Sequence, residues 1–356
     1  MTATTRTVQT VLSVVTPVYG CACVLEELTT RLFAQAAVMN VRMEIILVND
    51  GSPDGAWPKI EALARANPAI IGINLFRNYG QHFAITAGLD YASGDWVAVL
   101  DCDLQDLPEE LPKLYRTAVE GQFEAVFGRR ANRRDSLPKR CASWLFHAVI
   151  SLLSGVRSDP TIANFSVISR YVVDSVRMLR ERHRAYGHLV SVIGPKTASI
   201  DIEHARRPEG RSSYTLWKQL KLASDVIISY TNRPLHIAVF LGFSMSAIAA
   251  AWMTILLVRY FVYGFGVAGW ASTILTVWLV GGINLGMLGV FGLYLGRVFD
   301  QLKARPLYLV KNVIRNGETL KSTPSEGIGL SVTAAHTFST TQHLLHHKTL
   351  NKRTGV

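Results

Sequence analysis

A short apolar run that ends in two aspartates, VAVLDCD at residues 97–103, constrains the fold of this chain more than any other stretch. The apolar run predicts a buried strand of a parallel sheet. In open α/β sheets, ligands bind just beyond the carboxyl ends of the strands, where Asp101 and Asp103 stand. Side chains at positions i and i+2 of an extended segment share a face, so both carboxylates could bind one hard cation. Because an Asp-x-Asp pair alone is more often a solvated turn, the metal site needs support from the rest of the chain.

Strands and helices alternate on both sides of this run. Apolar runs predict further strands at residues 11–16, 44–48, 70–76 and 124–127. Helical spacing predicts helices at residues 24–39, 54–66, 81–92 and 108–121, the second capped by Asp54. The alternation predicts an α/β fold with a right-handed, doubly wound and mostly parallel sheet. Polar residues that follow successive strands should then meet at one edge of the sheet, where a nucleotide would bind: Asp50, Asn78, Asp101 and Asp103.

The composition and two long apolar stretches point to a membrane. Only 18% of the 356 residues are charged and 49% are hydrophobic. Residues 235–258 and 272–295 are each long enough to span a bilayer and contain no Asp, Glu, Lys or Arg. Arg259 is the only Lys or Arg in the loop between them, whereas many follow the second stretch. This asymmetry predicts a two-span hairpin with both termini in the cytoplasm.

Basic residues cluster before the predicted spans, and the net charge is +11. One cluster covers residues 129–140 and precedes an amphipathic segment at 143–156; the other covers residues 206–221. Both are either ordinary solvated surface or a surface for phosphate and membrane lipid. Nucleic-acid binding is the least favoured interpretation, because the clusters flank membrane segments. Glycines 282, 286, 289 and 296 form a seam on the second span that suits helix packing, within the chain or in a homo-oligomer.

These features divide the chain into four parts. We expect a cytoplasmic domain with amphipathic interface helices at 1–233, two transmembrane helices at 234–296, a basic juxtamembrane segment at 297–316 and a disordered tail at 317–356. The spacing of Cys21 and Cys23 fits neither a zinc site nor a redox Cys-x-x-Cys motif. All four cysteines, which include Cys102 and Cys141, are therefore expected to be reduced cytosolic thiols.

The motifs together resemble the family 2 glycosyltransferases of the GT-A fold, in the polyprenyl-phosphate hexosyltransferase branch. This branch includes dolichol-phosphate mannose synthase and bacterial undecaprenyl-phosphate glucosyltransferases. The resemblance covers about residues 10–315 and rests on these motifs: Pro17-Val18-Tyr19, Val48-Asn49-Asp50-Gly51-Ser52, Arg77-Asn78-Tyr79-Gly80, Ala87-Gly88-Leu89, Gly94-Asp95, Asp101-Cys102-Asp103-Leu104-Gln105-Asp106, Gly128-Arg129-Arg130, Lys139-Arg140 with Ser143, Asn164-Phe165 with Ser169-Arg170, Arg207-x-x-Gly210-x-Ser212-x-Tyr214 and Arg305-Pro306-Leu307-Tyr308.

The resemblance implies transfer of a hexose from a nucleotide sugar to undecaprenyl or dolichyl phosphate at the cytoplasmic membrane face, with inversion. UDP-glucose is the first choice of donor, with GDP-mannose or another UDP-sugar as alternatives. The implied nucleotide-sugar site contains Pro17, Tyr19, Asp50, Asn78, Asp101, Gln105 and Arg207. Asp101, Asp103 and Gln105 would hold Mg²⁺ or Mn²⁺, and the implied acceptor-phosphate residues are Arg129, Lys139, Arg140 and Ser143. Asp101, Asp103, Arg129 and Arg140 would be the catalytic residues.

The chain departs from the family pattern at three places. Gly20-Cys21-Ala22 replaces a frequent Asn-Glu-Glu, Gln81 replaces a frequent lysine, and Asn164 replaces the aspartate of an Asp-Phe-Arg motif. Asparagine cannot act as a general base, but an ionised phosphate acceptor needs none. Two alternatives stay open. One is a processive polysaccharide synthase, although the chain lacks the Gln-x-x-Arg-Trp motif typical of that group. The other is a sugar-nucleotide-binding membrane protein without catalytic activity.

Overall fold

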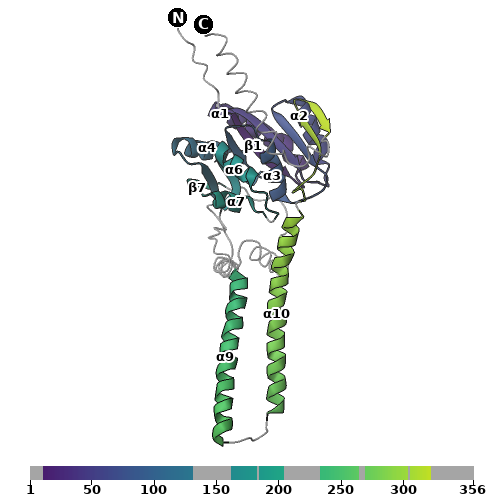
Figure 1. Cartoon of the computed structure of the whole chain (residues 1–356). Helices are drawn as coiled ribbons and strands as arrows, with labels where there is room; N and C mark the ends of the chain where they lie inside the picture. The colour runs from purple at the N-terminus through teal and green to yellow at the C-terminus, as the bar shows by residue number, and fades with distance from the viewer. Residues whose placement is uncertain are drawn as a thin grey trace, which may run out of the picture. The chain divides into compact units, whose positions relative to one another are not determined.

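The computed structural model of the chain describes residues 11–130, 162–182, 184–203, 233–263, 269–303 and 305–321 (Figure 1). The predicted binding residues Lys139, Arg140, Ser143 and Arg207 lie outside these ranges. The chain divides into two compact units. The sheet unit comprises Met1–Arg133, Thr161–Gly210 and Arg305–Val356, and the helical unit comprises Arg134–Pro160 and Arg211–Ala304. The sheet unit is thus built from both ends of the chain, which the contiguous domain at 1–233 did not anticipate.

One sheet forms the centre of the sheet unit, in the order β7-β5-β6-β4-β1-β2-β3-β8-β9 among the described residues. β1 pairs in parallel with β2 and β4, and β2 pairs in parallel with β3. This core confirms the predicted parallel arrangement. The strands are β1 (Val11–Val18), β2 (Arg42–Asn49), β3 (Ile70–Leu75), β4 (Trp96–Val99), β5 (Ala125–Arg130), β6 (Ile162–Ser169), β7 (Thr197–Ile202), β8 (Val310–Arg315) and β9 (Glu318–Lys321).

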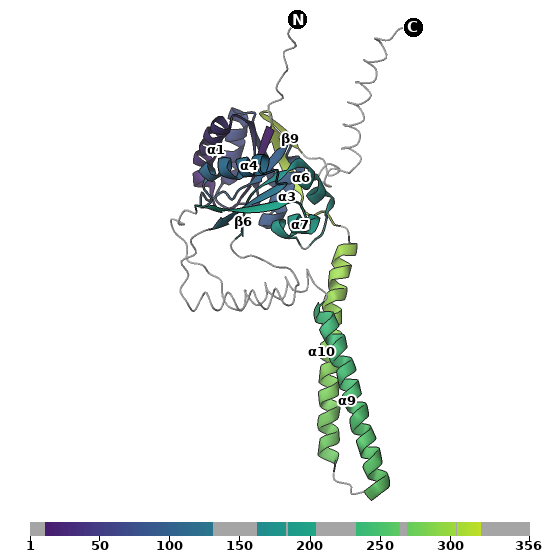
Figure 2. The ribbon, with the colours of Figure 1, turned by 90° about the vertical axis from the view of Figure 1, so that its left-hand side faces the viewer.

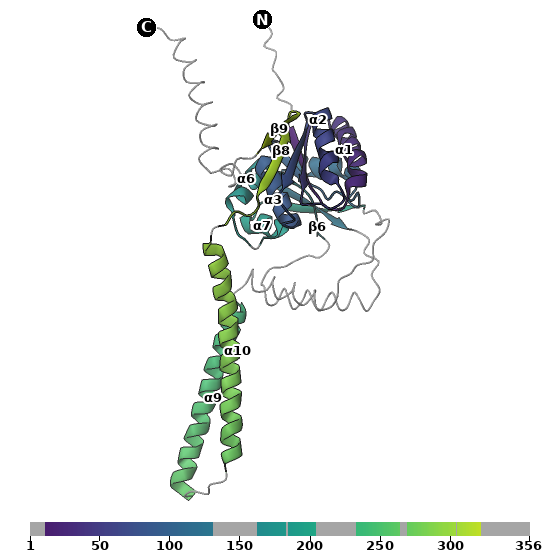
Figure 3. The same ribbon diagram turned by 90° about the vertical axis from the view of Figure 1, so that its right-hand side faces the viewer.

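Antiparallel strands, which the sequence analysis did not predict, flank this core. β6 is antiparallel to both β4 and β5, so β5 runs in the same direction as β4. β8 pairs antiparallel with β3, and β9 pairs antiparallel with β8 at the edge of the sheet (Figure 3). β9 lies inside the segment that was expected to be a disordered tail from residue 317, so ordered structure extends at least to Lys321.

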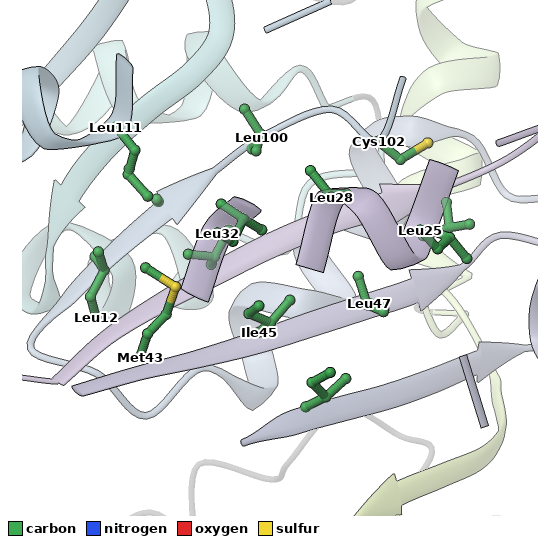
Figure 4. Packing of buried hydrophobic residues seen from close by; sticks show 14 of the residues in the cluster. Leu12, Leu25, Leu28, Leu32, Met43, Ile45, Leu47, Leu100, Cys102 and Leu111 are labelled. Atoms are coloured by element: carbon green, nitrogen blue, oxygen red, sulfur yellow. The ribbon is translucent and has the colours of Figure 1, made fainter. Parts of the chain in front are cut away.

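Helices cover both faces of the sheet, because inward and outward side chains alternate along the buried strands. On β2, Ile45 and Leu47 belong to a hydrophobic cluster to which α1, α2 and α4 also contribute, while Ile46 and Val48 belong to a second cluster with residues of α3, α6 and α7. Figure 4 shows Leu25, Leu28 and Leu32 of α1 against the first face. The helices are η1 (Ala22–Val24), α1 (Leu25–Met39), α2 (Ala56–Ala66), α3 (Gln81–Tyr91), η2 (Pro108–Glu110), α4 (Leu111–Glu120), α6 (Arg170–Met178) and α7 (Tyr186–Ile193).

The described part of the helical unit contains two long helices, α9 (Arg233–Tyr263) and α10 (Trp270–Leu302), which lie side by side (Figures 1 and 2). Within the described residues, one helical stretch, Thr276–Leu302, is long and apolar enough to cross a membrane, and Leu235–Met245 is a shorter apolar helix. Among the described residues, a methyl group at Gly282, Gly286, Gly289 or Gly296 of the predicted seam would meet no atom within 4 Å.

Candidate active site

A cavity of about 340 Å³ lies at the carboxyl ends of β1, β2 and β4. Four polar residues that the alternation placed at one edge of the sheet line this cavity together, as do Pro17 and Tyr19. The strand order explains why these residues lie close together, because β1 lies between β2 and β4 and all three strands run in the same direction. The full lining is Pro17, Val18, Tyr19, Gly20, Cys21, Asp50, Asn78, Gly80, Gln81, Asp101, Cys102 and Asp103.

Asp50 holds the loop that forms one wall of the cavity. Asp50 is 2% exposed, and its carboxylate accepts hydrogen bonds from the backbone N–H groups of Tyr79 (2.7 Å) and Gly80 (2.9 Å). Burial raises the pKa of Asp50, and the two backbone hydrogen bonds oppose this rise. Next to it, Gly51 has φ +64°, and a Cβ atom there would lie 2.6 Å from the backbone nitrogen of Asn78. Position 51 must therefore be glycine for the loop at Asn78 to pack this closely against it.

The loop after β2 also fixes the loop after β1. The Ser52 hydroxyl accepts from the Gly20 N–H (2.8 Å) and donates to Asp54. Asp54 in turn accepts from the Ala22 N–H at 2.7 Å. α2 begins at Ala56 with Gly55 as its N-cap residue, one position later than predicted. Asp54 still lies at this helix end, because a hydrogen bond from the Ala56 backbone contributes to lowering the pKa of Asp54, and it also holds the loop after β1.

Asp101 and Asp103 line the cavity, but not as neighbours on an extended strand. β4 ends at Val99, and the two aspartates lie in the turn that follows. The expectation that they share a strand face was therefore wrong. Gln81, the first residue of α3, donates from Nε2 to Asp101 Oδ1 at 2.6 Å. The backbone N–H of Gln105 donates to Asp103 Oδ1 at 3.1 Å.

The two aspartates fit a hard divalent cation only in part. Carboxylate oxygens are the ligands that Mg²⁺ and Mn²⁺ prefer. Among the described residues, no group of three or more His, Cys, Asp or Glu side chains is placed to hold a metal ion. Further ligands must then come from elsewhere, and phosphate oxygens and water are the usual partners of Mg²⁺ at such sites. The chemistry of the cavity thus suits a cation that arrives with a diphosphate.

Cys21 and Cys102 form a disulfide across the cavity lining, with their Cα atoms 6.3 Å apart. The prediction that all four cysteines are reduced is therefore wrong for these two. Cys23 is a free, exposed cysteine, and Cys141 lies outside the described residues. Cysteine spacing along the sequence does not reveal this pair, because the bonded residues are separated by 81 positions. The prediction rested on the local spacing of Cys21 and Cys23.

Two other predicted residues lie away from the lining. Gln105 contributes its backbone to Asp103 and is not among the residues that line the cavity. Arg129 is on β5, and β6 lies between β5 and β4, so roughly 10 Å separates the two backbones. Its Nε donates to Asp201 Oδ1 at 2.6 Å, and this hydrogen bond lowers the pKa of Asp201.

Asn164 stands at the same edge of the sheet as the aspartates. β6 pairs antiparallel with β4, with Val99 opposite Ser166. Asn164 lies on β6 beyond this pair, on the side of the sheet where β4 ends and the turn with the aspartates begins. The neighbouring Ser166 is buried and hydrogen-bonded to the Tyr186 hydroxyl at 2.7 Å, which fixes this part of the strand. The position where many relatives carry an aspartate is thus an amide at this edge of the sheet, and it is not among the residues that line the cavity.

Comparisons with known proteins agree with this architecture. The family described as "Glycosyl transferase family 2" matches residues 13–160. An undecaprenyl-phosphate 4-deoxy-4-formamido-L-arabinose transferase of Pseudomonas syringae pv. syringae is 33% identical over 325 residues, which is 90% of this chain and 95% of that protein. An uncharacterized glycosyltransferase of Synechocystis sp. is 33% identical over 302 residues, 85% of this chain and 95% of that protein.

Solved structures are more distant. The crystal structure of glucosyl-3-phosphoglycerate synthase from Mycobacterium tuberculosis with Mn²⁺, UDP-glucose and phosphoglyceric acid is 17% identical. It covers 63% of this chain and 79% of its own, with a TM-score of 0.44. The extent and identity of the two relatives settle the family. The chain belongs to glycosyltransferase family 2.

Proposed function

We propose that the chain transfers a sugar from a nucleotide sugar to the phosphate of a polyprenyl phosphate, with inversion at the anomeric carbon. The observation that carries the proposal is the cavity at the edge of the parallel sheet, where Asp101 and Asp103 meet Asp50 and Asn78. The relatives support the acceptor, because the Pseudomonas syringae protein is named for transfer to undecaprenyl phosphate.

The donor would bind in this cavity. Asp101 and Asp103 would hold Mg²⁺ or Mn²⁺ against the diphosphate, with Gln105 orienting Asp103 through its backbone N–H, and the cation would supply charge stabilisation for the departing nucleoside diphosphate. Pro17 and Tyr19 would contact the nucleoside. Asp50 could still accept a ribose hydroxyl, because a carboxylate has about four acceptor positions and backbone N–H groups use two.

The acceptor would supply its own nucleophile. A phosphomonoester has a second pKa of about 6, so its oxygen is largely ionised at neutral pH. This oxygen would attack the anomeric carbon, the bond from that carbon to the diphosphate would break, and the nucleoside diphosphate would leave. No side chain has to remove a proton, which agrees with an amide, Asn164, at the position where many relatives carry an aspartate. Arg129, Lys139, Arg140, Ser143 and Arg207 would neutralise the phosphate charges.

The membrane arrangement belongs to the same proposal. Stretch 276–302 would cross the bilayer, and α9 would form a second span, with the sheet unit and both termini on the cytoplasmic side. UDP-glucose is the first donor to test, followed by GDP-mannose, other UDP-sugars and nucleotide-linked 4-deoxy-4-formamido-L-arabinose. The last follows from the name of the Pseudomonas syringae relative.

The decisive experiment offers the full-length protein in detergent a panel of radiolabelled nucleotide sugars with either undecaprenyl phosphate or undecaprenol. We expect labelled lipid from the phosphate alone, with the reaction abolished by EDTA and restored by Mg²⁺ or Mn²⁺. Equal use of the alcohol would contradict the absence of a base. A lipid that carries many sugars would instead support a processive synthase.

Asp103→Ala tests the carboxylate pair directly. It should abolish transfer and leave the protein folded, because Asp103 follows the strand end and is not part of the hydrophobic core. Asp174→Asn is the matched control, since Asp174 lies on α6, is half exposed and does not line the cavity. Full activity of Asp103→Ala, or full activity of the wild type in EDTA, would overturn the metal assignment.

A further inference from the structure

We propose that Cys21 and Cys102 form a reversible, redox-controlled disulfide that weakens cation binding at the donor site when it is oxidised. The pairing itself follows from the geometry of the chain. Only the effect on the cation rests on the proposed function. Reduced, both residues would be thiols; oxidised, they are bonded as the structure shows.

The position of Cys102 connects the disulfide directly with the two aspartates of the site. Cys102 lies between Asp101 and Asp103, so a bond to its sulfur restrains the backbone that carries both carboxylates. The other end of the bond is a well-anchored loop, because Gly20 and Ala22 on either side of Cys21 are hydrogen-bonded to Ser52 and Asp54. Oxidation therefore ties the turn with the aspartates to a fixed point on the sheet unit.

This restraint opposes adjustment of the turn when a cation binds. In the disulfide-bonded structure, Asp101 Oδ1 accepts from Gln81 and Asp103 Oδ1 accepts from the Gln105 backbone. Each bond uses one oxygen of its carboxylate and leaves acceptor positions free, so cation binding depends on where the turn places the free oxygens. Any adjustment of the turn that brings these oxygens onto one ion is a movement of the backbone at Cys102. A free Cys102 lets its backbone follow this movement, whereas a bonded Cys102 holds it back.

The sulfur atoms are shielded from bulk solvent yet reachable through the site. Cys21 is 5% exposed and Cys102 is 7% exposed, and both line the cavity. The exchange with oxidised glutathione balances: two protein thiols would give up two electrons and two protons, and the oxidant would become two glutathione thiols. A dithiol would reverse the reaction. In a reducing compartment, protein disulfides are usually transient or redox-sensing, which suits control more than stability.

The test compares the oxidised and reduced full-length protein in detergent. The protein is equilibrated with oxidised glutathione or with dithiothreitol, remaining thiols are alkylated, and the Cys21–Cys102 peptides are identified by mass spectrometry. Hydrogen exchange at residues 100–105 reports the restraint without reference to function. Mn²⁺ binding in the presence of UDP is then measured for each state. We expect binding to weaken by about 5-fold or more on oxidation, the lower end of couplings between linked sites.

Two variants separate the disulfide from other effects of oxidation. Cys21→Ser and, independently, Cys21→Ala should make Mn²⁺ binding insensitive to glutathione, because they remove the partner without altering the turn that carries the aspartates. Cys23→Ser is the matched control: it removes the neighbouring exposed cysteine and should keep the full redox response. By reciprocity, Mn²⁺ with UDP should shift the thiol–disulfide equilibrium of the wild type toward the reduced form, by the same factor as oxidation weakens Mn²⁺ binding.

Three results would overturn the proposal: no Cys21–Cys102 peptide under oxidising conditions, equal or tighter Mn²⁺ binding by the oxidised protein, or a redox response that survives in the Cys21 variants. If Mn²⁺ binds neither state, the metal assignment of the proposed function fails. The redox control of this turn is then decided by hydrogen exchange alone, where equal exchange in both states would overturn it.

Discussion

The Tyr308 hydroxyl donates to Asp90 Oδ2 at 2.5 Å, and this hydrogen bond joins the segment after α10 to the last turn of α3. Arg180 binds both oxygens of the same carboxylate, at 2.8 and 2.9 Å. Burial and the nearby carboxylate raise the pKa of Tyr308 well above its ordinary value, so the phenol stays protonated and remains a donor. The first turn of α3 holds Asp101 through Gln81, so one helix connects this hydrogen bond with the candidate active site.

Replacing Tyr308 with phenylalanine should lower the free energy of unfolding by about 1–2 kcal/mol, because a buried hydrogen bond to a carboxylate is lost. Arg180 still pairs with Asp90, which keeps the cost from rising further. Tyr171→Phe is the control, since Tyr171 is 68% exposed. Denaturant unfolding of the full-length protein in detergent measures both. Equal stability of Tyr308→Phe and Tyr171→Phe would contradict the importance of this contact.

Gly51→Ala should impair donor binding far more than Gly55→Ala. Both glycines have positive φ, +64° and +74°, so both alanine variants should lose roughly 1 kcal/mol of stability from backbone strain. Only at Gly51 would the new Cβ collide with the backbone of the loop at Asn78, whereas nothing lies within 4 Å of a Cβ at Gly55. Binding of UDP with Mn²⁺, measured by calorimetry, distinguishes the two. Similar losses in both variants would show that the loop at Asn78 can give way.

Acid should destabilise the sheet unit through His82. Burial, together with repulsion from Arg184, lowers the pKa of His82 below its ordinary value of 6.5. Its Nδ1 accepts the Tyr186 N–H at 3.3 Å, which only the neutral ring can do. Below about pH 6.5 the unfolded chain therefore binds more protons than the folded protein, and the free energy of unfolding falls as the pH falls.

His82→Gln should lose less stability than the wild type between about pH 7 and about pH 5, because glutamine does not titrate there. Part of the acid sensitivity should remain, since burial also lowers the pKa of His188. Thermal unfolding at several pH values measures the slope. A slope in His82→Gln as steep as in the wild type would exclude His82 as a source of acid sensitivity.

The two-span topology can be tested with a cysteine at Gly266, in the loop between α9 and α10 and outside the described residues. If both helices cross the membrane, a membrane-impermeant maleimide should label Gly266→Cys in intact cells. The native Cys23 provides an internal control, because it is exposed on the sheet unit and should react only after permeabilisation. Labelling of Gly266→Cys only in permeabilised cells would reverse the topology.

Local patterns predicted the parallel core of the sheet but not its flanks. Strands β1 to β3 are apolar runs bounded by turn residues. The expectation that polar residues after parallel strands meet at one edge of the sheet is confirmed for Asp50 and Asp101, which line one cavity. β6 and β8 have no such local signature, because what defines them is pairing with strands far away in the sequence. β8 resembles a basic juxtamembrane segment until β3 is seen beside it.

The details of the site were harder to predict for the same reason. Extended geometry was assumed through Asp103, whereas the strand ends at Val99 and a turn redirects both carboxylates. Gln81 was noticed only as a departure from a frequent lysine, and its hydrogen bond to Asp101 depends on how α3 meets β4. The disulfide likewise depends on two loops that only the folded sheet brings together.

Because β3 pairs with β8, the sheet can be completed only after nearly the whole chain has been synthesised. β3 ends at Leu75 and β8 begins at Val310, so roughly 10–50 s of synthesis separates the two strands at typical rates. Throughout that time β3 is an open edge that invites pairing with other chains. The same order limits how a soluble form can be designed. A stop codon before α9 would leave this edge permanently unpaired, whereas an internal deletion that joins residue 203 to residue 305 through a linker would keep β8 and β9.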